Sequence, residues 1–571
     1  MKKPAILRFC GILLVVSLLF TNYFRDYRGN EHPFISDVDQ YYSYLPAALI
    51  HHDLSFKFPN AYWLVDAPNG NRVPKVSMGM AVLYSPWFLI AEGINKTFGI
   101  DDKGGYSLTH IRVFELGSAL YLVTACLLLL LVLRRYFTEK VALIAIGLTV
   151  LGTNLFYYAY GWSLMAHLYQ FFVFSSIIYL TVRWYEKQRH QHAMLLGFML
   201  GIAVIVRPVD IFIGLIPVLY GITGIGEIKD RMIWWRKNWI DVLLLKVAFF
   251  IPVFLQLFYW KIYAGEWLFF SYGSSERFFF DNPQLLNFLF SYRKGWLLYT
   301  PLMAFALLGF WWLRNRVKEL WTPILLIIGI NLYLLSSWWA WWYGGSFGNR
   351  SMVQYYALLI FPLAALIANR AEQQKGRIAL LTLGGLLVAL NIFQTHQYKK
   401  SLIHWDSMTK EAYWAVFLKN GAPENFDALI WEPDYEGMKR NGFENGIPVK
   451  QTLFENGKAI TAEEEFPGGF DFSLNKLEQS EVGKLRSSVQ LKSDSPIDNG
   501  LFMVFTAQDG DSMLVYKSVP LVIENNETGK WKTFVIKHNL VGLSGCNLTL
   551  KLYIWNKDKR AVNANKFQVT N

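Results

Sequence analysis

Cysteine and charged residues are scarce in this sequence, which removes several classes of protein from consideration. Only three of the 571 residues are cysteines, and only 17% of the residues carry a charge. Cys10 and Cys126 lie inside apolar runs, while Cys546 stands alone near the C-terminus. No disulfide framework and no metal-ligand spacing is therefore visible.

Apolar and aromatic residues are abundant instead. Hydrophobic residues make up 53% of the chain and aromatic residues 17%, with 22 Trp and 31 Tyr. Soluble domains are rarely so apolar, and Trp and Tyr are enriched at membrane interfaces. The formal net charge is +12, but the Lys and Arg residues fall between apolar runs. That placement fits the positive-inside bias of membrane proteins better than nucleic-acid binding. We therefore predict a polytopic α-helical membrane protein.

The first apolar run, Ala5–Thr21, resembles a signal peptide because Lys2, Lys3 and Arg8 stand at its start. A small-x-small cleavage site is missing before Asn22–Arg25. We predict an uncleaved first helix with its N-terminus in the cytoplasm. Residues 22–110 are too polar to span a membrane and should form a long outer loop with two amphipathic pieces, the second lying in the interface plane. These pieces are Gln40–Ile50 and Met78–Ile94.

Further apolar runs each approach the length that a bilayer requires. They cover residues 112–133, 141–160, 162–182, 193–206, 209–225, 241–263, 296–313, 321–340, 351–369 and 378–395. Together with the first helix they predict about eleven spans. Arg207-Pro208 separates the short pair 193–206 and 209–225, where a single kinked helix is the alternative.

The charges of the connections agree with this count. If alternate connections are assigned to the cytoplasm, every inside connection is basic. These connections contain Arg134, Arg135 and Lys140; Arg183 to Arg189; Lys229, Arg231, Arg236 and Lys237; Arg314, Arg316 and Lys318; and Arg370, Lys375 and Arg377. The assignment places everything after about residue 396 outside the membrane.

The composition changes near residue 396, where charged residues and Asn, Asp and Gly turns begin. We predict a linker over 396–449 with an amphipathic piece at Thr409–Leu418, and a β-domain over 450–571. Its alternating stretches are typical of a jelly-roll-like sandwich. They are Leu485–Leu491, Leu501–Thr506, Ser512–Tyr516, Trp531–Lys537 and Leu548–Trp555.

An acidic pair, Asp37 and Asp39, follows the first helix and precedes Tyr41 and Tyr42. One interpretation is a solvated loop whose aspartates cap the next helix. A carboxylate near basic groups can instead act as a general base on a hydroxyl. A third possibility is that both aspartates ligate a divalent cation, Mg²⁺ or Mn²⁺.

Several basic residues recur on the same predicted side of the membrane. A structural role is the alternative to ligand binding for several of them. They are Arg72, Lys75, His167, Arg207, Arg293, Lys294 and Arg350. Arg207 could form a local ion pair with Asp210 across Pro208. Arg293 and Lys294 could snorkel to lipid head groups. His167 could be a hydrogen-bonded core residue.

Arg350 ends the stretch Trp341–Asn349, which contains three glycines. An interfacial anchor explains the tryptophans, whereas glycines allow a backbone to approach a ligand closely. Arginine clusters suit a phosphate, because the guanidinium fork pairs two oxygens at once. The outer side therefore indicates a phosphate-bearing substrate with one apolar end.

A set of short motifs lies on the predicted outer side between residues 5 and 395. They are Asp37-Val38-Asp39-Gln40-Tyr41-Tyr42, Tyr84-Ser85-Pro86, Asn154-Leu155-Phe156-Tyr157-Tyr158 with His167, Val206-Arg207-Pro208-Val209-Asp210, Leu289 to Gly295, Tyr299-Thr300-Pro301 and Tyr343 to Arg350. This set resembles the membrane-embedded GT-C glycosyltransferases, which use polyprenyl-phosphate sugars as donors. They include protein mannosyltransferases and the aminoarabinose transferase of lipid A.

The resemblance implies that residues 1–395 are a GT-C transmembrane domain that catalyses an inverting sugar transfer. The acceptor would be a lipid, a glycan or a protein, on the outer side of a bacterial inner membrane. Asp37 or Asp39 would be the base; the family often has adjacent acids, and here they are spaced by Val38. The donor and its phosphate would contact Lys75, Tyr84, His167, Arg207, Arg293, Lys294, Tyr343 and Arg350.

Two other classes of function remain open. A flippase or another transporter of lipid-linked sugars would also have many helices and charges within the membrane. A surface-binding protein would need its helices only to anchor the β-domain, and one helix would suffice for that.

The topology can be tested with a reporter that is active only in the cytoplasm. Fused after Asn571, it should be silent, because the basic connections place that residue outside. The same reporter fused within the connection at Lys140 should be active and serves as the control. A strongly active fusion at Asn571 would refute the topology.

Overall fold

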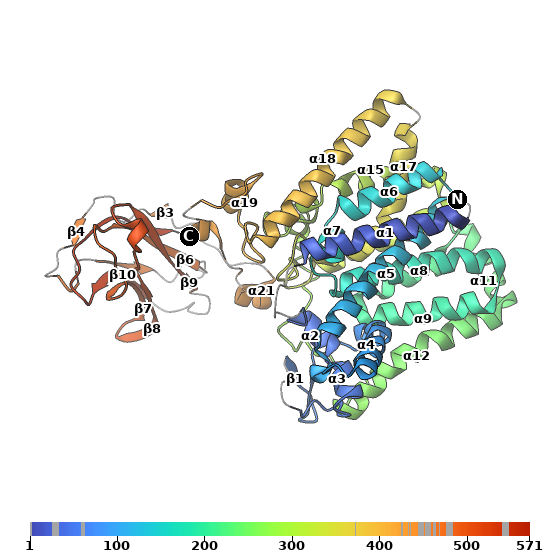
Figure 1. The fold of residues 1–571 in the computed structure, drawn as a ribbon, viewed down its shortest axis with the longest axis horizontal. Coiled ribbons are helices and arrows are strands. Elements are labelled where there is room, and N and C mark those ends of the chain that lie inside the picture. Colours follow the sequence, from blue (N-terminus) through green and yellow to red (C-terminus); the bar gives the residue numbers. More distant parts are fainter. Residues whose placement is uncertain are drawn as a thin grey trace.

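The computed structural model describes residues 3–25, 33–58, 63–371, 373–423, 426–431, 433, 435–442, 450–451, 458–460, 464–466, 469–474, 484–539 and 548–570. A helical N-terminal region is followed by a C-terminal region of small antiparallel sheets. The N-terminus lies at the end of the helical region that is far from these sheets (Figure 1).

Helices dominate the chain up to residue 441. They are α1 (Lys3–Phe24), α2 (Asp37–Tyr42), α3 (Tyr44–Leu49), α4 (Gly79–Phe98), η1 (Lys103–Gly105), α5 (Leu108–Leu133), α6 (Glu139–Leu151), α7 (Leu155–Tyr160), α8 (Ala166–Lys187), α9 (His190–Val206), η2 (Pro208–Gly214), α10 (Leu215–Leu219), α11 (Gly226–Lys237), α12 (Trp239–Tyr263), α13 (Leu285–Phe290), α14 (Trp296–Tyr299), α15 (Leu302–Arg316), α16 (Lys318–Ser336), η3 (Arg350–Tyr355), α17 (Tyr356–Ala371), α18 (Gln374–Lys399), α19 (Lys410–Val416), α20 (Phe426–Leu429) and α21 (Tyr435–Asn441). Here η marks a 3₁₀-helix.

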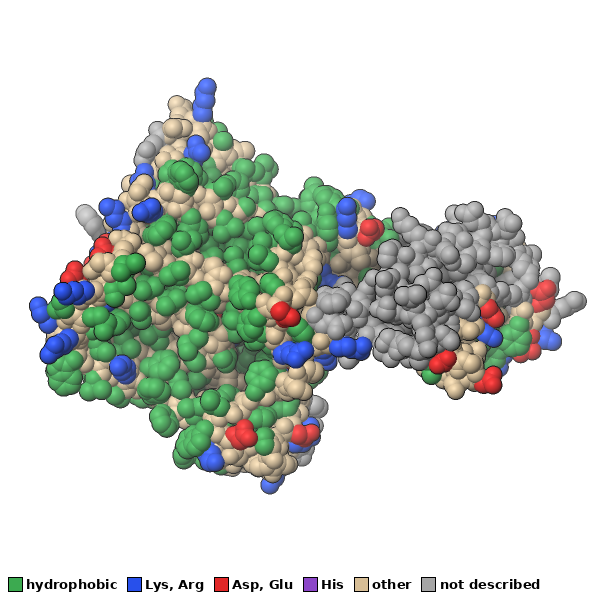
Figure 2. All heavy atoms as spheres, turned by 180° about the vertical axis from the view of Figure 1, so that it is seen from behind, with side chains coloured by type: hydrophobic (Ala, Val, Ile, Leu, Met, Phe, Trp, Pro, Cys, Tyr) green, Lys and Arg blue, Asp and Glu red, His purple; other side chains and the backbone are tan. Residues whose placement is uncertain are grey.

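Among the described residues, 5 helical segments are long and apolar enough to cross a membrane. They are α5, α12, α16, α18 and the continuous stretch from η3 through α17. Shorter apolar helices are Arg8–Phe24, His190–Val206 and Pro208–Leu219. Figure 2 shows hydrophobic side chains over much of one face of this region, as expected for a surface that meets lipid.

Some predicted runs are interrupted, and one predicted break between runs is confirmed. The run 141–160 forms α6 and α7, which are separate helices. After α9, Arg207 adopts an extended conformation with φ −146° and ψ 109°, and Pro208 starts η2. The alternative of a single kinked helix over 193–225 is therefore wrong, because the backbone leaves the helical region of φ and ψ at Arg207.

Small residues let the helices approach closely. A Cβ atom at Gly197 of α9 would lie 2.0 Å from the carbonyl oxygen of Leu245 in α12. One turn later, a Cβ atom at Gly201 would lie 2.4 Å from the carbonyl oxygen of Phe249. This small-xxx-small spacing brings two backbones together without a hydrophobic driving force, as in other membrane helix pairs.

Several of the predicted inside connections meet at one end of the helical region. Arg135, between α5 and α6, forms an ion pair with Glu186 at the end of α8. The backbone N–H of Gly221, after α10, donates to the carbonyl of Glu319 at the start of α16. The basic connections are thus neighbours in space as well as alternate in sequence.

The predicted outer loop contains the 20-residue helix α4 together with shorter elements. The strands β1 (Leu64–Asp66) and β2 (Arg72–Pro74) form an antiparallel hairpin. The predicted piece Gln40–Ile50 is divided between α2 and α3, whereas Met78–Ile94 corresponds to α4.

The C-terminal region contains β3 (Lys450–Gln451), β4 (Lys458–Ile460), β5 (Gly469–Leu474), β6 (Lys484–Lys492), β7 (Leu501–Asp509), β8 (Ser512–Pro520), η4 (Asn525–Glu527), β9 (Lys532–Asn539), β10 (Leu548–Asn556) and β11 (Val562–Thr570). The strand orders are β5-β10-β7-β8 in one sheet and β3-β11-β6-β9 in the other, with β4 paired to β11. A single apolar core takes Leu491 from β6, Phe505 from β7 and Leu552 from β10. The predicted alternating stretches are confirmed as strands.

Candidate functional site

An ion pair between Asp37 and Arg350 lies at the centre of the candidate site. Asp37 is the first residue of α2, and Arg350 is the first residue of η3. Arg350 Nη1 lies 2.8 Å from Asp37 Oδ2, and the two side chains are 17% and 30% exposed. Both charges are therefore only partly hydrated, and each is the principal counter-charge of the other.

A second guanidinium, Arg207, lies beside the same group of residues. Its Cζ is 5.7 Å from the centre of the Tyr343 ring, and its Nη1 is 3.4 Å from His167 Nδ1. The same His167 nitrogen is 3.3 Å from Gln354 Oε1. Across the described ranges, no carboxylate lies within ion-pair distance of Arg207, and the acid that acts on its charge at longer range is Asp210.

Tyr41 and Tyr272 connect the two arginines and were not singled out from the sequence. Burial raises the pKa of the Tyr41 hydroxyl, and Asp37 raises it further, while Arg350 and Arg207 oppose the shift. Burial and Asp37 also raise the pKa of Tyr272, again opposed by both arginines. The two hydroxyls therefore experience the charges of one common cluster. Tyr41 lies in the motif Asp37–Tyr42 but had no predicted role. Nothing in the sequence around Tyr272 distinguished it from other aromatic residues in loops.

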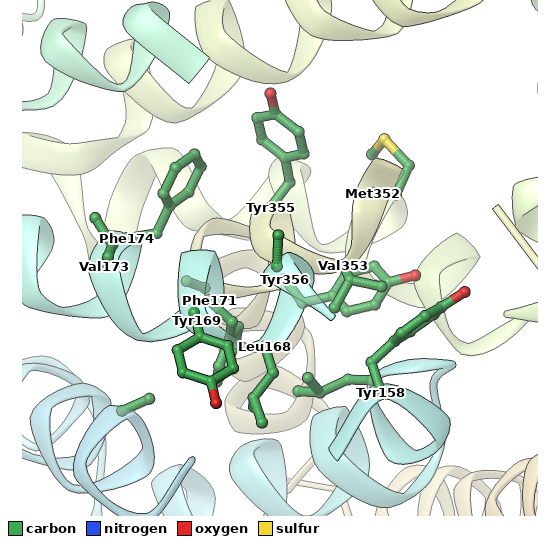
Figure 3. Packing of buried hydrophobic residues seen from close by; sticks show 14 of the residues in the cluster. Tyr158, Leu168, Tyr169, Phe171, Val173, Phe174, Met352, Val353, Tyr355 and Tyr356 are labelled. Atoms are coloured by element: carbon green, nitrogen blue, oxygen red, sulfur yellow. The ribbon is translucent and has the colours of Figure 1, made fainter. Parts of the chain in front are cut away.

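The segment that carries Arg350 is fixed by packing on α8. Figure 3 shows Met352, Val353 and Tyr355 of η3 among the buried side chains of α8. The Tyr355 ring meets the Phe174 ring edge-on, with ring centres 5.4 Å apart. Arg350 is thus the first residue of a rigid, fully buried segment.

Asp210 does not form the local ion pair with Arg207 that was the ordinary alternative. Its buried carboxylate instead accepts hydrogen bonds of 2.7 Å from Gln170 and from the Tyr355 hydroxyl. Asp210 is therefore a buried structural acceptor that joins η2 to η3 and α8, and it acts on Arg207 at a longer range than a direct ion pair.

The glycines before Arg350 are explained by backbone conformation and packing. Gly344 and Gly348 have φ values of +63° and +60°, which L-residues with side chains rarely adopt. A Cβ atom at Gly345 would lie 2.8 Å from the ring of Trp405. Asn154 donates hydrogen bonds of 3.1 and 3.2 Å to the carbonyls of Phe347 and Asn349. The loop is therefore shaped to place Arg350.

Lys294 is completely buried, so snorkelling to head groups is excluded for it. Its ammonium donates to the carbonyl oxygens of Ser346 and His404 and thereby holds the glycine-rich loop. Burial lowers the pKa of Lys294 to about 7, with Asp406 opposing the shift. Arg293 is 8% exposed and lies 5.3 Å from the ring centre of Trp342, so it too packs inward.

The predicted linker contributes to this wall of the site. Asp406 is buried and accepts a 2.8 Å hydrogen bond from Trp342 Nε1 and another from the Tyr435 hydroxyl. The Ser346 N–H donates to the carbonyl of Trp405 at 3.0 Å. Sequence analysis missed Asp406, because a single acid in a polar stretch carries no local signal.

Lys75 and Tyr84 have protein partners in the structure. Lys75 Nζ lies 2.8 Å from Glu276 Oε1 and 4.7 Å from the centre of the Tyr272 ring, so it borders the cluster. The buried Tyr84 hydroxyl donates to the carbonyl of Leu164. Their contact with a donor stays a prediction. Arg72 is more exposed and lies 3.8 Å from Asp66.

Asp39 points to a different partner from Asp37. The Tyr106 hydroxyl donates to Asp39 Oδ1 at 3.5 Å. Residues two apart on a helix do not share a face, so the two carboxylates do not converge on one cation. The described residues contain no group of three His, Cys, Asp or Glu side chains suited to a metal. The capping interpretation is also wrong, since both aspartates lie inside α2 and Ser36 occupies its N-cap.

Comparison with known proteins gives structural similarity only. A scan against models of known protein families finds no match, and no curated protein sequence matches either. Among solved structures, the chain is similar to the oligosaccharyltransferase of Archaeoglobus fulgidus, with a TM-score of 0.38 and 15% identity over 70% of this chain. It is also similar to the arabinosyltransferase EmbB of Mycobacterium smegmatis, with a TM-score of 0.34 and 9% identity over 81% of this chain.

The chain covers 56% and 58% of the lengths of these two proteins. Because both TM-scores lie below 0.5, a function has to follow from the side chains described above.

Asp39 should make the stability of the protein depend on pH. Burial raises the pKa of Asp39 to about 6, opposed by the hydrogen bond from Tyr106. Between about pH 4 and this value the folded state binds more protons than the unfolded chain, so stability falls as pH rises. Asp39→Asn removes the charge and keeps the acceptor for Tyr106. We expect it to raise the unfolding temperature at pH 7.5 by roughly 1–3 °C, and not at pH 4.

Thermal unfolding of the detergent-solubilised protein at the two pH values measures this effect. Asp53→Asn is the matched control with the opposite sign, because hydrogen bonds from Ser55 and Lys57 lower the pKa of Asp53. If the Asp39→Asn protein is no more stable than the wild type at pH 7.5, then the raised pKa of Asp39 does not destabilise the folded protein at that pH.

Proposed function

We propose that the protein is a GT-C glycosyltransferase that moves a sugar from a polyprenyl-phosphate donor to a lipid, glycan or protein acceptor. The carrying observation is the partly buried Asp37–Arg350 ion pair, with Arg207 next to it and no carboxylate within ion-pair distance of Arg207 among the described residues. This arrangement offers a base for a hydroxyl and two guanidinium groups for a phosphate.

In the proposed reaction, Asp37 accepts the proton of the acceptor hydroxyl. The hydroxyl oxygen attacks the anomeric carbon from the face opposite the phosphate, and the bond from that carbon to the phosphate oxygen breaks. The electron pair leaves with the polyprenyl phosphate, and the sugar inverts its configuration. The phosphate is stable as an anion, so no general acid is needed.

Arg207 and Arg350 are the best candidates to stabilise the leaving phosphate. Arg350 can hold Asp37 and one phosphate oxygen with different guanidinium N–H groups, because it presents five donors. Lys294 donates to two carbonyl oxygens and is better suited to positioning the loop than to binding a donor. Tyr343 and His167 orient Arg207.

The proposal includes about eleven membrane crossings, which the alternation of helices between the two ends supports. The N-terminus would be cytoplasmic, and the site and residues 450–571 would lie outside, at the inner membrane of a bacterium. The two sheets that share a core support a jelly-roll-like sandwich there. In this proposal Asp406, in the predicted linker, supports the site through its hydrogen bond from Trp342.

A transporter of lipid-linked sugars would use a similar phosphate site, but Asp37 would have no acceptor to deprotonate. The two functions differ in what happens to a radiolabelled polyprenyl-phosphate sugar in proteoliposomes. A transferase releases the label from the lipid and attaches it to an acceptor, whereas a flippase moves the intact lipid across the bilayer.

Asp37→Asn tests the base. Asparagine preserves the shape and still accepts a hydrogen bond from Arg350, but it cannot take a proton. We expect donor binding within about threefold of the wild type and turnover reduced by roughly a hundredfold or more. The assay is transfer of label from the donor, with the change in donor binding measured separately.

Asp39→Asn is the matched control for this substitution and should leave turnover nearly intact, because its partner is Tyr106. If the two phenotypes are exchanged, Asp39 is the base. Equal losses that added Mg²⁺ or Mn²⁺ partly restores would favour a metal instead. Full activity of both variants would remove the acidic pair from the reaction.

Arg350→Lys tests the phosphate contact. Lysine keeps the positive charge beside Asp37 but loses the planar fork that can hold two acceptors at once. Donor affinity should therefore fall by roughly tenfold, corresponding to about 1.4 kcal/mol. Lys75→Arg is a control at the border of the cluster and should change donor affinity less. Unchanged kinetics of a folded Arg350→Ala protein would exclude Arg350 from the site.

A further inference from the structure

The short helix α11 is held against the end of the helical region that is remote from the candidate site (Figure 1). The Arg231 guanidinium lies 4.2 Å from the centre of the Tyr185 ring and donates to the carbonyl of Tyr220. The Trp234 ring lies 4.6 Å from the same tyrosine ring, centre to centre. These contacts use one face of α11 and fix its orientation.

Another face of α11 is apolar and largely uncovered. Ile225 at the N-cap, Ile228 and Met232 recur at intervals of three and four residues, so they lie along one stripe, and Trp239 begins α12 just beyond Asn238. Ile225 is 88% exposed, Met232 58% and Trp239 60%. Trp235, at the edge of the stripe, donates a hydrogen bond of 3.4 Å to the Tyr185 hydroxyl, whereas Ile225, Ile228 and Met232 stay exposed.

The membrane is the surface that this stripe meets. It continues directly into the exposed apolar side chains of α12, including Leu243, Val247 and Phe250. Because α12 is one of the candidate membrane spans, those side chains face lipid. The stripe of α11 therefore lies where α12 enters the bilayer, as in helices that rest in the membrane interface.

Basic side chains border the stripe on one side. Lys229 and Arg236 are two helical turns apart, so both project from the same edge, roughly 10 Å from each other along the axis. Both are exposed, and neither lies within ion-pair distance of a carboxylate among the residues that the structure describes. Their charges are free for a ligand at the level of the lipid head groups.

We propose that α11 is a docking surface for anionic membrane lipids, with Lys229 and Arg236 binding the phosphates of neighbouring head groups. Charge complementarity and continuity with the lipid-facing side of α12 support this occupant. Two cations spaced along a helix match a row of head groups at a membrane surface. The proposal concerns the basic end of the helical region and does not depend on the sugar-transfer reaction.

The full-length protein, stripped of lipid in detergent, can be titrated with phosphatidylglycerol or with phosphatidylcholine, and the bound lipid counted by native mass spectrometry. We expect the wild type to bind phosphatidylglycerol more tightly. Lys229→Gln with Arg236→Gln should reduce that affinity by roughly tenfold or more, since each basic residue near a lipid surface is worth about 1 kcal/mol. Binding of phosphatidylcholine should change little.

Two further variants make the result specific. Lys530→Gln with Lys557→Gln removes the same charge from the C-terminal region and should leave phosphatidylglycerol binding unchanged. Lys229→Arg with Arg236→Lys keeps both charges and should retain the preference, which a merely structural defect would not predict. Unfolding temperatures check that each variant is folded.

Four outcomes would overturn the proposal. One is equal binding of both lipids by the wild type, and another is an unchanged preference in the doubly neutralised protein. The third is that the wild type forms a dimer at every lipid concentration and the neutralised protein does not. That result would identify a second copy of the chain as the occupant. Competition by millimolar inorganic phosphate alone would likewise indicate an ion site rather than a lipid site.

Discussion

The ion pair between Asp37 and Arg350 is the constraint on which the outer end of this protein depends. Arg350 opens a segment, η3 with α17, whose side chains are buried along its whole hydrophobic window. A guanidinium at the mouth of such a segment is costly unless a counter-charge is supplied. Asp37 supplies it from α2, which the first outer loop holds beside the helices. The pair therefore joins the first loop to the interior of the helical region and places a carboxylate beside the guanidinium group of Arg350.

The surroundings of Arg350 are built to keep it in place. The glycine-rich loop before it is held by Asn154 from one side and by the buried Lys294 from the other. Asp406 extends this support to the segment after α18. A phosphate site gains from such rigidity, because donors fixed before binding lose little entropy when the ligand arrives. This gives a physical reason why Asp406, which follows α18, packs onto the site.

The two ends of the helical region differ in chemistry. One end carries the ion pair, Arg207 and a set of buried tyrosines, whereas the other collects basic connections and the exposed stripe of α11. An enzyme that uses a lipid-linked donor must hold its site at a constant depth relative to the bilayer. An interfacial helix that binds head groups at the opposite surface would serve this purpose, since α12 runs directly on from it.

The sequence by itself determined many of the elements, and their sidedness stays a prediction from it. Helices follow from apolar runs, strands from alternation, and the inside connections from their lysines and arginines, and each of these signals is local. Tertiary structure decided the partners. It pairs Asp37 with Arg350, and it places the Tyr106 hydroxyl where it donates a hydrogen bond to Asp39. The sequence alone does not distinguish these two acids. It also made Asp210 a buried hydrogen-bond acceptor, buried Lys294, and brought Tyr272 to the cluster. Such contacts join residues far apart in the chain, and only the packing of helices brings them within reach, so no spacing along the chain encodes them.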